Sequence, residues 1–396
     1  MIGGIKMNSR FDNIIDRYNT NSIKYDFIKE HQYPDDVLPL WVADMDFQSP
    51  PEVITALSKL AEHGIYGYTG IKEPYFLTLA HWFSSRFSWN VQKDWLVCTP
   101  TVVSALSIAV RTFTKEGDSV LIQRPVYHPF THVVETNKRK VVNNPLLYHN
   151  GKYQIDFEDF EKKIVEHRVK LFILCSPHNP VGRVWTKEEL TEMGNICLKH
   201  DVLVLSDEIH CDFIYKGFQH TIFASISEAF ANHCIICTAP TKTFNLAGLQ
   251  ISNIFIPNPK LRAQFQSALE EIKFPSPNLF GITACQAAYT YGEPWLEELK
   301  EYLSSNISYV RNFLIENLPM IHLVEPEGTY LLWIDFSELG LSEEELENFI
   351  IYKAKLWLNA GTMFGEEGRQ FERFNIACPR KILEQAMVRL KRAIKE

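Results

Sequence analysis

Several short apolar runs in the sequence are each followed by a residue with a reactive or hydrogen-bonding side chain. Asp207 closes one run, and Asn179 and Lys242 follow two others. Tyr127 and the hydroxyl-rich stretch 99–104 follow two more. Together they offer a carboxylate, an amide, a nucleophilic amine, an aromatic ring and hydroxyl groups. Such a set suits a flat, charged aromatic ligand that reacts with an amine.

The pattern of the apolar runs predicts the elements that would position these residues. The expected strands are residues 95–98, 119–123, 171–176, 202–207, 234–238 and 251–256. Helical stretches such as 102–113 and 188–199 lie between them. Continuous apolar strands that alternate with helices are typical of a mostly parallel sheet covered on both faces. Ligands of such sheets bind beyond the carboxyl ends of the strands, so we expect the residues above to share one edge.

After about residue 285 the alternation of short apolar runs and helical stretches is replaced by a second α/β region that begins with a long polar helical segment. Its expected elements are a long polar helix at 294–317, a strand at 330–336 and an amphipathic helix at 382–395. We therefore predict a large α/β domain over residues 47–285 and a smaller, discontinuous domain that combines 1–46 with 286–396. Capping boxes, which satisfy the first amides of a helix, are predicted at Ser49, Thr186 and Ser342.

Composition and charge argue against several classes of protein. The chain has 396 residues, of which 46% are apolar and 22% are charged, as is ordinary for a globular protein. The net charge of −8 argues against a nucleic-acid partner. The apolar runs are far shorter than the roughly 18 residues that span a bilayer, and the first residues lack the apolar core of a secretory signal. We expect a cytoplasmic protein with no membrane or nucleic-acid partner.

The cysteines do not indicate a disulfide scaffold, because 8 in 396 residues are too few. Cys234 and Cys237 form a CxxC pair beside His233, which taken alone suggests a metal or redox site. The sequence has no second such pair, and the residues around this one are apolar. We therefore predict that these are buried strand cysteines, with no metal bound, in a reducing compartment.

The first turn of the expected helix at 102–113 suits a phosphate group. Thr101–Val103 would present free amides and the positive end of the helix dipole. The hydroxyls of Thr99, Thr101 and Ser104 could add hydrogen-bond donors. A phosphate site of this kind is one of the two parts of a binding site for pyridoxal 5′-phosphate; the other part must hold the aromatic ring.

The remaining residues suit the ring of the same cofactor. Tyr127 can stack on a flat heteroaromatic ring. Asp207 would keep the pyridine nitrogen protonated, so that the ring withdraws electrons. Asn179 can donate to the phenolate oxygen. Lys242 supplies an amine for a Schiff base and, once a substrate displaces it, a proton shuttle.

Ordered short segments in the chain resemble a known family. SPHNPVGR (176–183), LSDEIH (205–210), TKTFNLAGL (241–249) and RFNIACPR (373–380) are similar to fold-type I aminotransferases of class I and II. WVADMDF (41–47), GYTG (67–70) and AGLQ (247–250) resemble the bacterial carbon–sulfur β-lyases of the MalY/PatB branch. The resemblance covers the chain from about residue 10 to the end. It implies an α/β fold of PLP-dependent transferase fold type I, with a mostly parallel seven-stranded sheet between helices and a smaller α/β domain.

The resemblance also implies roles for individual residues, with Lys242 as the catalytic one. The implied cofactor-binding residues are Asp207, Asn179, Tyr127, His210, Thr101, Val102, Thr241, Lys242 and Tyr68. The implied substrate-binding residues are Arg373, Ala43 and Tyr127. Arg373 would hold the substrate α-carboxylate, for which a guanidinium is well shaped, and Ala43 would lie in a loop that closes over the same group. Tyr68 would reach the phosphate of the neighbouring subunit, so that the active unit is a homodimer.

Two positions depart from the pattern of the wider aminotransferase family. His210 stands where many members have a tyrosine that donates to the ring oxygen, and Gln250 stands where many have a phosphate-binding arginine. Both departures are usual in the β-lyase branch, and they weaken the aminotransferase interpretation more than the cofactor assignment. Trp41, Asp44 and Met45 lie in a distinctive segment, but the sequence assigns them no role.

The reaction that the resemblance favours is α,β-elimination. L-Cystathionine would give homocysteine, pyruvate and ammonia, with L-cysteine as a second substrate. The first alternative is an aminotransferase of aromatic or aliphatic amino acids, because the same residues serve both reactions. A second alternative, of another class, is a regulatory protein that uses a PLP-binding scaffold for protein contacts. Release of pyruvate and thiol, or conversion of the cofactor to its amine form, would distinguish them.

Overall fold

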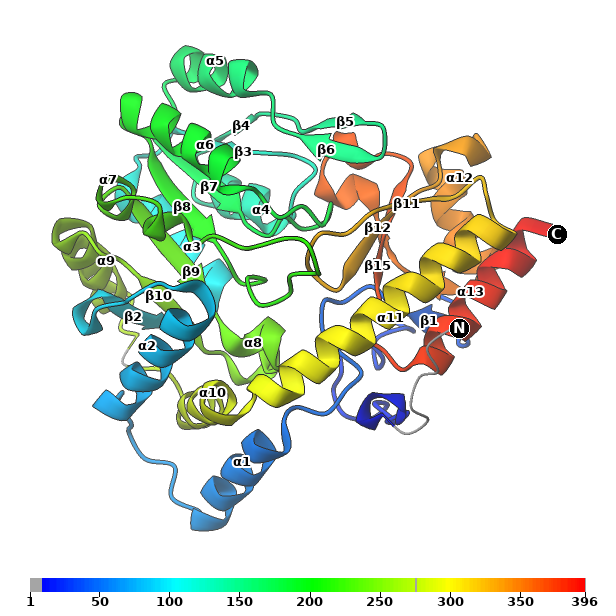
Figure 1. The fold of residues 1–396 in the computed structure, drawn as a ribbon, viewed down its shortest axis with the longest axis horizontal. Helices are drawn as coiled ribbons and strands as arrows, with labels where there is room; N and C mark the ends of the chain where they lie inside the picture. Colours follow the sequence, from blue (N-terminus) through cyan, green and yellow to red (C-terminus); the bar gives the residue numbers. More distant parts are fainter. Residues whose placement is uncertain (1–8, 275, 396) are drawn as a thin grey trace. The chain divides into compact units, whose positions relative to one another are not determined.

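The computed structural model describes residues 9–274 and 276–395, which form two compact units (Figure 1). The large unit comprises Ser49–Leu296 and Pro326–Thr329. The small unit comprises the chain up to Gln48, Glu297–Glu325 and the chain from Tyr330 onward. The small unit is therefore assembled from segments that lie far apart in the sequence.

The large unit is built on a seven-stranded sheet in the order β2-β10-β9-β8-β7-β3-β4. Its strands are β2 (Leu96–Thr99), β3 (Ser119–Ile122), β4 (Lys140–Asn143), β7 (Leu171–Cys175), β8 (Leu203–Asp207), β9 (Cys234–Thr238) and β10 (Ser252–Phe255). Only β10 runs opposite to the other strands of this sheet, since it pairs antiparallel with both β2 and β9. The predicted α/β fold with a mostly parallel seven-stranded sheet is confirmed.

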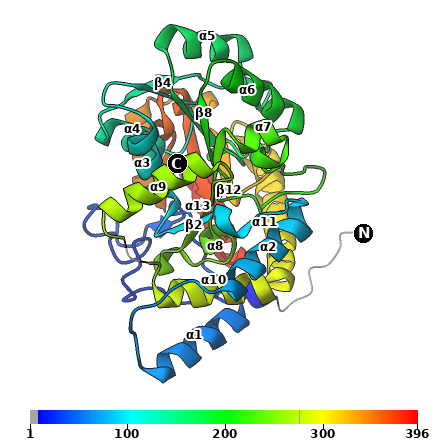
Figure 2. The ribbon, with the colours of Figure 1, turned by 90° about the vertical axis from the view of Figure 1, so that its left-hand side faces the viewer.

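Helices cover both faces of this sheet (Figure 2). The helices of the large unit are α1 (Pro51–His63), α2 (Glu73–Phe87), α3 (Val102–Phe113), α4 (Pro129–Thr136), α5 (Phe157–His167), α6 (Lys187–Lys199), α7 (Glu228–Ala231), α8 (Pro240–Thr243), α9 (Pro259–Glu271) and α10 (Leu279–Tyr291), of which α1 packs on α10. In Figure 2, α3, α4 and α9 lie on one side of the strands, and α6 and α7 lie on the other. Because both faces are covered, every residue of β3, β7, β8, β9 and β10 is buried, and these strands read as continuous apolar runs.

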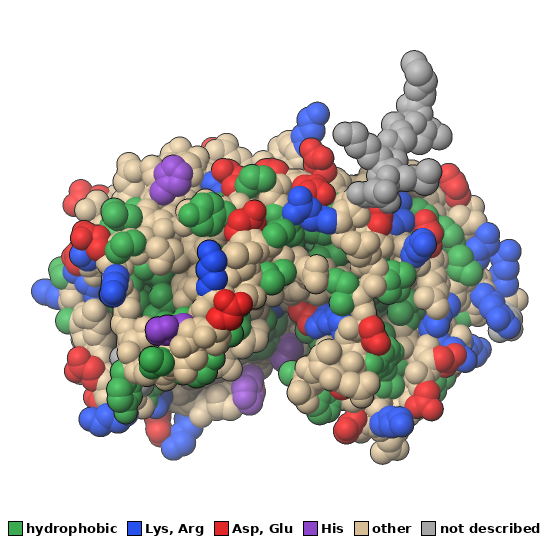
Figure 3. All heavy atoms as spheres, turned by 90° about the horizontal axis from the view of Figure 1, so that it is seen from below, with side chains coloured by type: hydrophobic (Ala, Val, Ile, Leu, Met, Phe, Trp, Pro, Cys, Tyr) green, Lys and Arg blue, Asp and Glu red, His purple; other side chains and the backbone are tan. Residues whose placement is uncertain are grey.

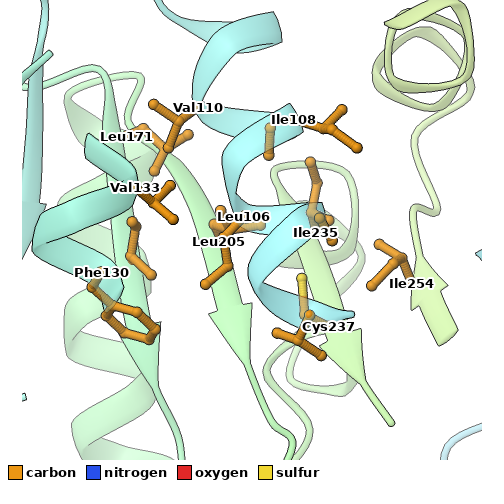
Figure 4. Close-up of a cluster of buried hydrophobic side chains, with 14 of the residues drawn as sticks. Leu106, Ile108, Val110, Phe130, Val133, Leu171, Leu205, Ile235, Cys237 and Ile254 are labelled. Carbon is orange, nitrogen blue, oxygen red and sulfur yellow. The ribbon is translucent and has the colours of Figure 1, made fainter. Parts of the chain in front are cut away.

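The main hydrophobic core lies between the sheet and the helices α3, α4 and α9. Figure 4 shows Leu106 of α3 and Phe130 of α4 among strand residues such as Leu205 and Ile235, and all four are fully buried. Burial of each such side chain contributes about 1.5–3 kcal/mol. This core fixes the strands whose ends carry the candidate site.

The strands and helices for which the sequence analysis gave bounds lie within two residues of those bounds. β4 and the hairpin of β5 (Leu147–His149) with β6 (Lys152–Gln154) were not predicted, because edge and surface strands lack a continuous apolar run. The capping boxes at Thr186 and Ser342 are confirmed. The one at Ser49 is wrong: Pro50 is the N-cap of α1 and makes no side-chain cap, while the Ser49 hydroxyl donates to the carbonyl of Asn245 (3.4 Å).

The small unit contains a four-stranded antiparallel sheet in the order β11-β12-β15-β14. Its elements are β1 (Leu38–Pro39), α11 (Glu293–Asn317, whose first turn belongs to the large unit), β11 (His322–Val324), β12 (Leu331–Asp335), α12 (Glu343–Asn348), β13 (Leu356–Trp357), β14 (Asn359–Ala360), β15 (Phe371–Asn375) and α13 (Arg380–Lys395). The helices α11 and α13 lie side by side, and Lys391 Nζ on α13 donates to Asn317 Oδ1 on α11 (2.6 Å). β1 pairs in parallel with β13, which ties the N-terminal segment to this unit.

Charged side chains of both signs are interspersed on the face seen in Figure 3, without a large patch of one sign. Within residues 9–274 and 276–395, no helix combines the length and apolar character needed to cross a membrane. All eight cysteines are buried without a disulfide, and Cys234 and Cys237 lie in β9. Burial raises the pKa of both thiols well above its ordinary value, so neither provides a thiolate at neutral pH.

Candidate active site

The candidate site of the large unit lies where β2, β3, β7, β8 and β9 end. These strands point the same way, because the reversed strand β10 separates β2 from β9 and restores the common direction. The register pairs Cys175 with Asp207, and Asp207 with Cys237. The last residues of β7 and β8 therefore lie next to each other. Apart from Tyr68, the predicted residues of the large unit lie at or directly after the ends of these strands, as expected.

Asp207 is the last residue of β8 and is 4% exposed. Its carboxylate accepts a hydrogen bond from the amide of Ile209 (3.1 Å). Burial raises the pKa of Asp207 to about 7, with Glu208 adding to the rise and the amide of Ile209 and the charge of Lys242 opposing it. A cation placed against this carboxylate would keep it ionised, and a protonated pyridine nitrogen is such a cation.

Lys242 belongs to the short helix α8, which starts directly after β9 and brings the lysine to the same edge. The lysine is half-buried, and its charge acts on Asp207. The next residue anchors the helix, since the Thr243 hydroxyl donates to Asp212 Oδ2 (2.8 Å). Asp212 is buried and is also held by Trp82 Nε1 (3.2 Å) and Arg86 Nε (3.2 Å).

Asp212 is a residue that the sequence analysis missed. It lies in the segment EIHCDF, where a charged residue is surrounded by the buried residues Cys211 and Phe213. An acidic residue in such a position needs partners, and this was the signal in the sequence. The structure shows that one of those partners adjoins Lys242.

The phosphate end of the predicted site is only partly as expected. Thr101 is the N-cap of α3, and its side chain accepts from the amide of Ser104 (3.0 Å). The first amides of the helix, at Val102 and Val103, have no partner within the helix and suit an anion. The prediction that Thr99 adds a donor is wrong: its hydroxyl is buried, donates to the carbonyl of Thr101 (3.0 Å) and lies 2.7 Å from that of Ser252.

The loops that follow β3 and β7 are joined by a main-chain hydrogen bond. The amide of Tyr127 donates to the carbonyl of Asn179 (3.0 Å), so the two predicted ring-binding residues lie together. The buried His178, which the sequence analysis did not select, adds a second link through Nε2 to the carbonyl of Pro125 (2.9 Å). Burial lowers the pKa of His178 to about 4, so the ring is neutral at physiological pH and donates from Nε2.

The other predicted residues of the large unit vary in exposure. His210 is buried in the turn after β8, with 4% of its surface exposed, and Thr241 is half-buried in α8. Gln250 is exposed and left-handed, with φ +50°. Tyr68 is fully exposed, at 107%, in the segment 64–72 that carries no helix before α2. These positions leave the implied contacts of His210, Thr241 and Tyr68 with the cofactor as predictions.

Arg373 and Ala43, the predicted substrate-binding residues, belong to the small unit. Arg373 lies on β15, is 5% exposed, and donates through Nη2 to the carbonyl of Trp41 (2.9 Å) and to the Asn359 side chain. The carbonyl of Ala43 accepts from the hydroxyl of Tyr330 (3.0 Å). The structure thus links Arg373 to the segment that contains Ala43.

The structure gives positions to the three residues that the sequence left without a role. The indole of Trp41 stacks on that of Trp357, with ring centroids 4.5 Å apart and planes at 15°. Asp44 is paired with Arg17 (2.7 Å), and Met45 is buried with 1% of its surface exposed. All three hold the segment 41–46 in place.

The donors at the sheet edge fit pyridoxal 5′-phosphate. A buried carboxylate with a raised pKa, an amine whose charge acts on that carboxylate, and helix amides in the first turn of α3 match the ring nitrogen, the aldehyde and the phosphate. No cluster of His, Cys, Asp or Glu capable of holding a metal ion was found in the described part of the chain.

Comparison with known proteins identifies the family. The model of the family "Aminotransferase class I and II" matches residues 35–390. Cystathionine beta-lyase PatB of Bacillus subtilis is 44% identical over 97% of this chain and 99% of its own length. Protein MalY of Escherichia coli is 33% identical over 97% of this chain and 98% of its own.

A solved structure agrees with these relatives. Cystalysin from Treponema denticola, a structure described as containing a pyridoxal 5′-phosphate cofactor, superimposes with a TM-score of 0.95. It is 40% identical, and the match covers 98% of this chain and 99% of that one. The predicted resemblance to the MalY/PatB branch is confirmed. The chain belongs to the class I and II aminotransferase family and, within it, is similar along its whole length to enzymes of the cystathionine β-lyase type.

Proposed function

We propose that the protein is a PLP-dependent carbon–sulfur β-lyase that cleaves L-cystathionine, and L-cysteine as a second substrate, to a thiol, pyruvate and ammonia. The observation that carries this proposal is the buried Asp207 carboxylate at the carboxyl edge of the sheet. Burial raises the pKa of this carboxylate, and the positive charge of Lys242 acts in the opposite direction, so the two groups interact. The 44% identity to PatB over 97% of the chain supports the choice of elimination.

The large domain, residues 47–285, would bind the cofactor at this edge. The residues proposed to hold it are Lys242, Asp207, Asn179, Tyr127, His210, Thr101, Val102, Thr241 and Tyr68 of a neighbouring subunit. The small domain, residues 1–46 and 286–396, would bind the substrate carboxylate through Arg373, with Ala43 in the loop beside it and Tyr127 contributing from the large domain. The cytoplasm is the proposed compartment, in keeping with eight cysteines carried as free thiols.

The residues of this chain divide the proposed reaction into a few tasks. Bound pyridoxal phosphate supplies an electron sink for the charge that develops at the substrate Cα. Lys242 holds the cofactor through its amine, and after a substrate replaces it the free amine removes the Cα proton. Asp207, kept ionised by the ring nitrogen, holds a proton on that nitrogen. Arg373 orients the substrate by its α-carboxylate, which places the Cα proton for transfer.

A direct assay tests the proposal against its alternatives. The purified holoenzyme is incubated with L-cystathionine, and pyruvate and free thiol are measured together over time. We expect the two products in equal amounts, without any added 2-oxo acid. Conversion of the cofactor to its amine form with 2-oxo acid turnover, and without thiol release, would instead make the protein an aminotransferase. Absence of both reactions would favour the regulatory alternative.

We also propose a homodimer in which Tyr68 completes the neighbouring site. Tyr68 is fully exposed, and its segment presents further exposed apolar residues, Ile65, Tyr66 and Ile71. A contiguous set of exposed aromatic and aliphatic side chains is typical of a surface that contacts another chain.

Hybrid dimers test this assembly. We expect co-expressed Lys242→Ala and Tyr68→Ala subunits to regain activity at limiting cofactor, because in each hybrid one site takes an intact lysine from one subunit and an intact tyrosine from the other. Random mixing then restores about one quarter of the sites. The matched control replaces Tyr68→Ala with Tyr291→Ala, since Tyr291 is also an exposed tyrosine (61%) but lies outside the segment 64–72. Activity of the first mixture equal to the mean of its parents would contradict the shared site.

A further inference from the structure

The segment 41–46 of the small unit is fixed on one side by the side chains of the antiparallel sheet region. Four of its main-chain carbonyls accept hydrogen bonds from this region: Trp41 from Arg373 Nη2 (2.9 Å), Val42 and Asp44 from Asn375 Nδ2 (2.6 Å each), and Ala43 from the hydroxyl of Tyr330 (3.0 Å). The amide of Asp46 donates to the carbonyl of Ala377 (2.9 Å). Arg373 is therefore part of the set of contacts that positions this segment.

The other side of the same segment is held by an ion cluster from the N-terminal part of the chain, called here the arm cluster: Arg17, Lys24, Asp44 and Asp46. Arg17 pairs with Asp44 (2.7 Å) and with Asp46 (2.7 Å). Lys24 Nζ lies 2.8 Å from Asp46 and 3.7 Å from Asp44. The hydroxyl of Tyr25 donates to Asp46 Oδ2 (3.0 Å). The cluster is neutral overall, with two cations and two carboxylates.

Because the arm cluster is buried, its stability depends on the exact positions of its charged groups. The side chain of Lys24 is 0% exposed and that of Asp46 is 5% exposed. A buried charge is stable only while its partner stays in place, whereas an exposed ion pair tolerates movement. The segment 41–46 therefore cannot shift away from the arm without leaving a buried charge unpaired.

The part of the chain that supplies the two cations has no regular secondary structure. Residues 13–37 contain no helix or strand. Stretches of this length without secondary structure are uncommon in compact proteins and usually have a function. Arg17, Lys24 and the hydroxyl of Tyr25 hold the acidic end of the segment 41–46. The ring of His31 lies against that of Trp41 at the other end.

We propose that the arm cluster sets the orientation of the Arg373 guanidinium through the segment 41–46, so that Lys24 and Asp44 are positioning residues for the substrate α-carboxylate. This rests on the proposed function, in which Arg373 binds that carboxylate. A guanidinium is a rigid planar fork, and its Nη2 donates both to the Trp41 carbonyl and to the Asn359 side chain. A displacement of the Trp41 carbonyl therefore changes the direction in which the fork presents its N–H groups. Movement of the segment by about 1 Å would spoil a two-point contact with a carboxylate.

The test uses the holoenzyme with Lys24→Met and, separately, the isosteric Asp44→Asn. We expect KM for the amino-acid substrate to rise about 10-fold or more while kcat changes about threefold or less, because binding of the carboxylate is lost equally in the ground and transition states. Affinity for cysteine relative to 2-aminoethanethiol, which lacks the carboxylate, should fall by the same factor. Binding is followed by the visible absorbance of the bound cofactor.

A readout that does not depend on turnover is amide hydrogen exchange. Exchange of the amides in 41–46, including that of Asp46, should speed up in Lys24→Met and Asp44→Asn. The control variant is Arg10→Gln, which breaks another ion pair of the N-terminal part, with Glu298 (3.0 Å), whose side chains are 49% and 37% exposed. We expect its KM, its selectivity and its exchange over 41–46 to match the wild type.

Wild-type KM and wild-type carboxylate selectivity in both Lys24→Met and Asp44→Asn would overturn the proposal. If Lys24→Met does not fold, Asp44→Asn decides, since its side chain keeps its shape and is 19% exposed in the wild type. The wild type provides the separate check on the proposed function. If it binds cysteine no better than 2-aminoethanethiol, the role of Arg373 is wrong, and the inference fails with it.

Discussion

We expect Lys242→Ala to lower elimination of L-cystathionine by roughly 10⁴-fold or more, while the protein still folds and still binds the cofactor weakly. The loss is this large because one amine both holds the cofactor and moves the Cα proton. The fold survives because Lys242 is half-buried at the end of the sheet and is not part of the hydrophobic core. Pyruvate release measures the activity, and the visible absorbance of the lysine-bound cofactor disappears with it.

Lys216→Ala is the matched control, because this lysine is exposed on a loop of the same unit. It should retain wild-type activity and wild-type absorbance. Added methylamine or ethylamine should restore part of the proton transfer in Lys242→Ala, which would separate loss of the amine from damage to the fold. Full elimination activity in Lys242→Ala would show that another residue performs this step.

Asp207→Asn is expected to lower kcat by about 10²–10³-fold, because an amide cannot hold a proton on the ring nitrogen and the developing charge at Cα loses its stabilisation. The amide has nearly the same shape as the carboxylate, so packing at the end of β8 is preserved. Asp201→Asn serves as the control, since the Asp201 side chain is 96% exposed in the turn that leads into β8. The control should match the wild type in kcat and in cofactor binding.

The same substitution changes the pH dependence of stability of the cofactor-free protein. In the folded chain burial raises the pKa of Asp207 from 3.8 to about 7, so between these pH values the folded state binds a proton that the unfolded state has released. The free energy of unfolding therefore falls as pH rises from about 4 to about 7, by up to about 1.4 kcal/mol per pH unit from this group, and is flat above.

Urea unfolding of the cofactor-free protein at pH 5 and at pH 8 measures this effect. We expect Asp207→Asn to gain stability relative to the wild type at pH 8, where the wild-type carboxylate is buried and charged, and to lose most of that advantage at pH 5. An equal difference between the two proteins at both pH values would contradict the raised pKa. Bound cofactor should remove the difference at pH 8, because the ring nitrogen then pairs with the carboxylate.

The central sheet and the residues at its edge were largely predictable from the sequence. The strands β7, β8 and β9 are buried on both faces, so each is a continuous apolar run whose end is marked by the first polar residue. Parallel strands end at a common edge, so Asp207 and Lys242 could be brought together without knowledge of the structure. The resemblance in ordered short segments then supplied the cofactor and favoured elimination, which local patterns alone do not distinguish from transamination.

Other features required the tertiary structure, because they depend on residues that are far apart in the sequence. The hydroxyl of Thr99 is occupied by Ser252, and this contact exists only because β2 and β10 are paired. Asp212 holds Thr243 beside Lys242, although neither a motif nor a period relates the two.

The sequence by itself determined the class of fold, the edge at which the polar residues gather and the chemical identity of the groups there, because burial and strand direction are written in short local patterns. Only the tertiary structure decided which of those groups already form hydrogen bonds within the protein and which other residues hold them in place. It showed that Arg373 lies against the segment 41–46, and that Lys24, 0% exposed, is paired with Asp46, 22 positions away in the sequence. Partners of buried charges are chosen by three-dimensional proximity, which no local pattern encodes.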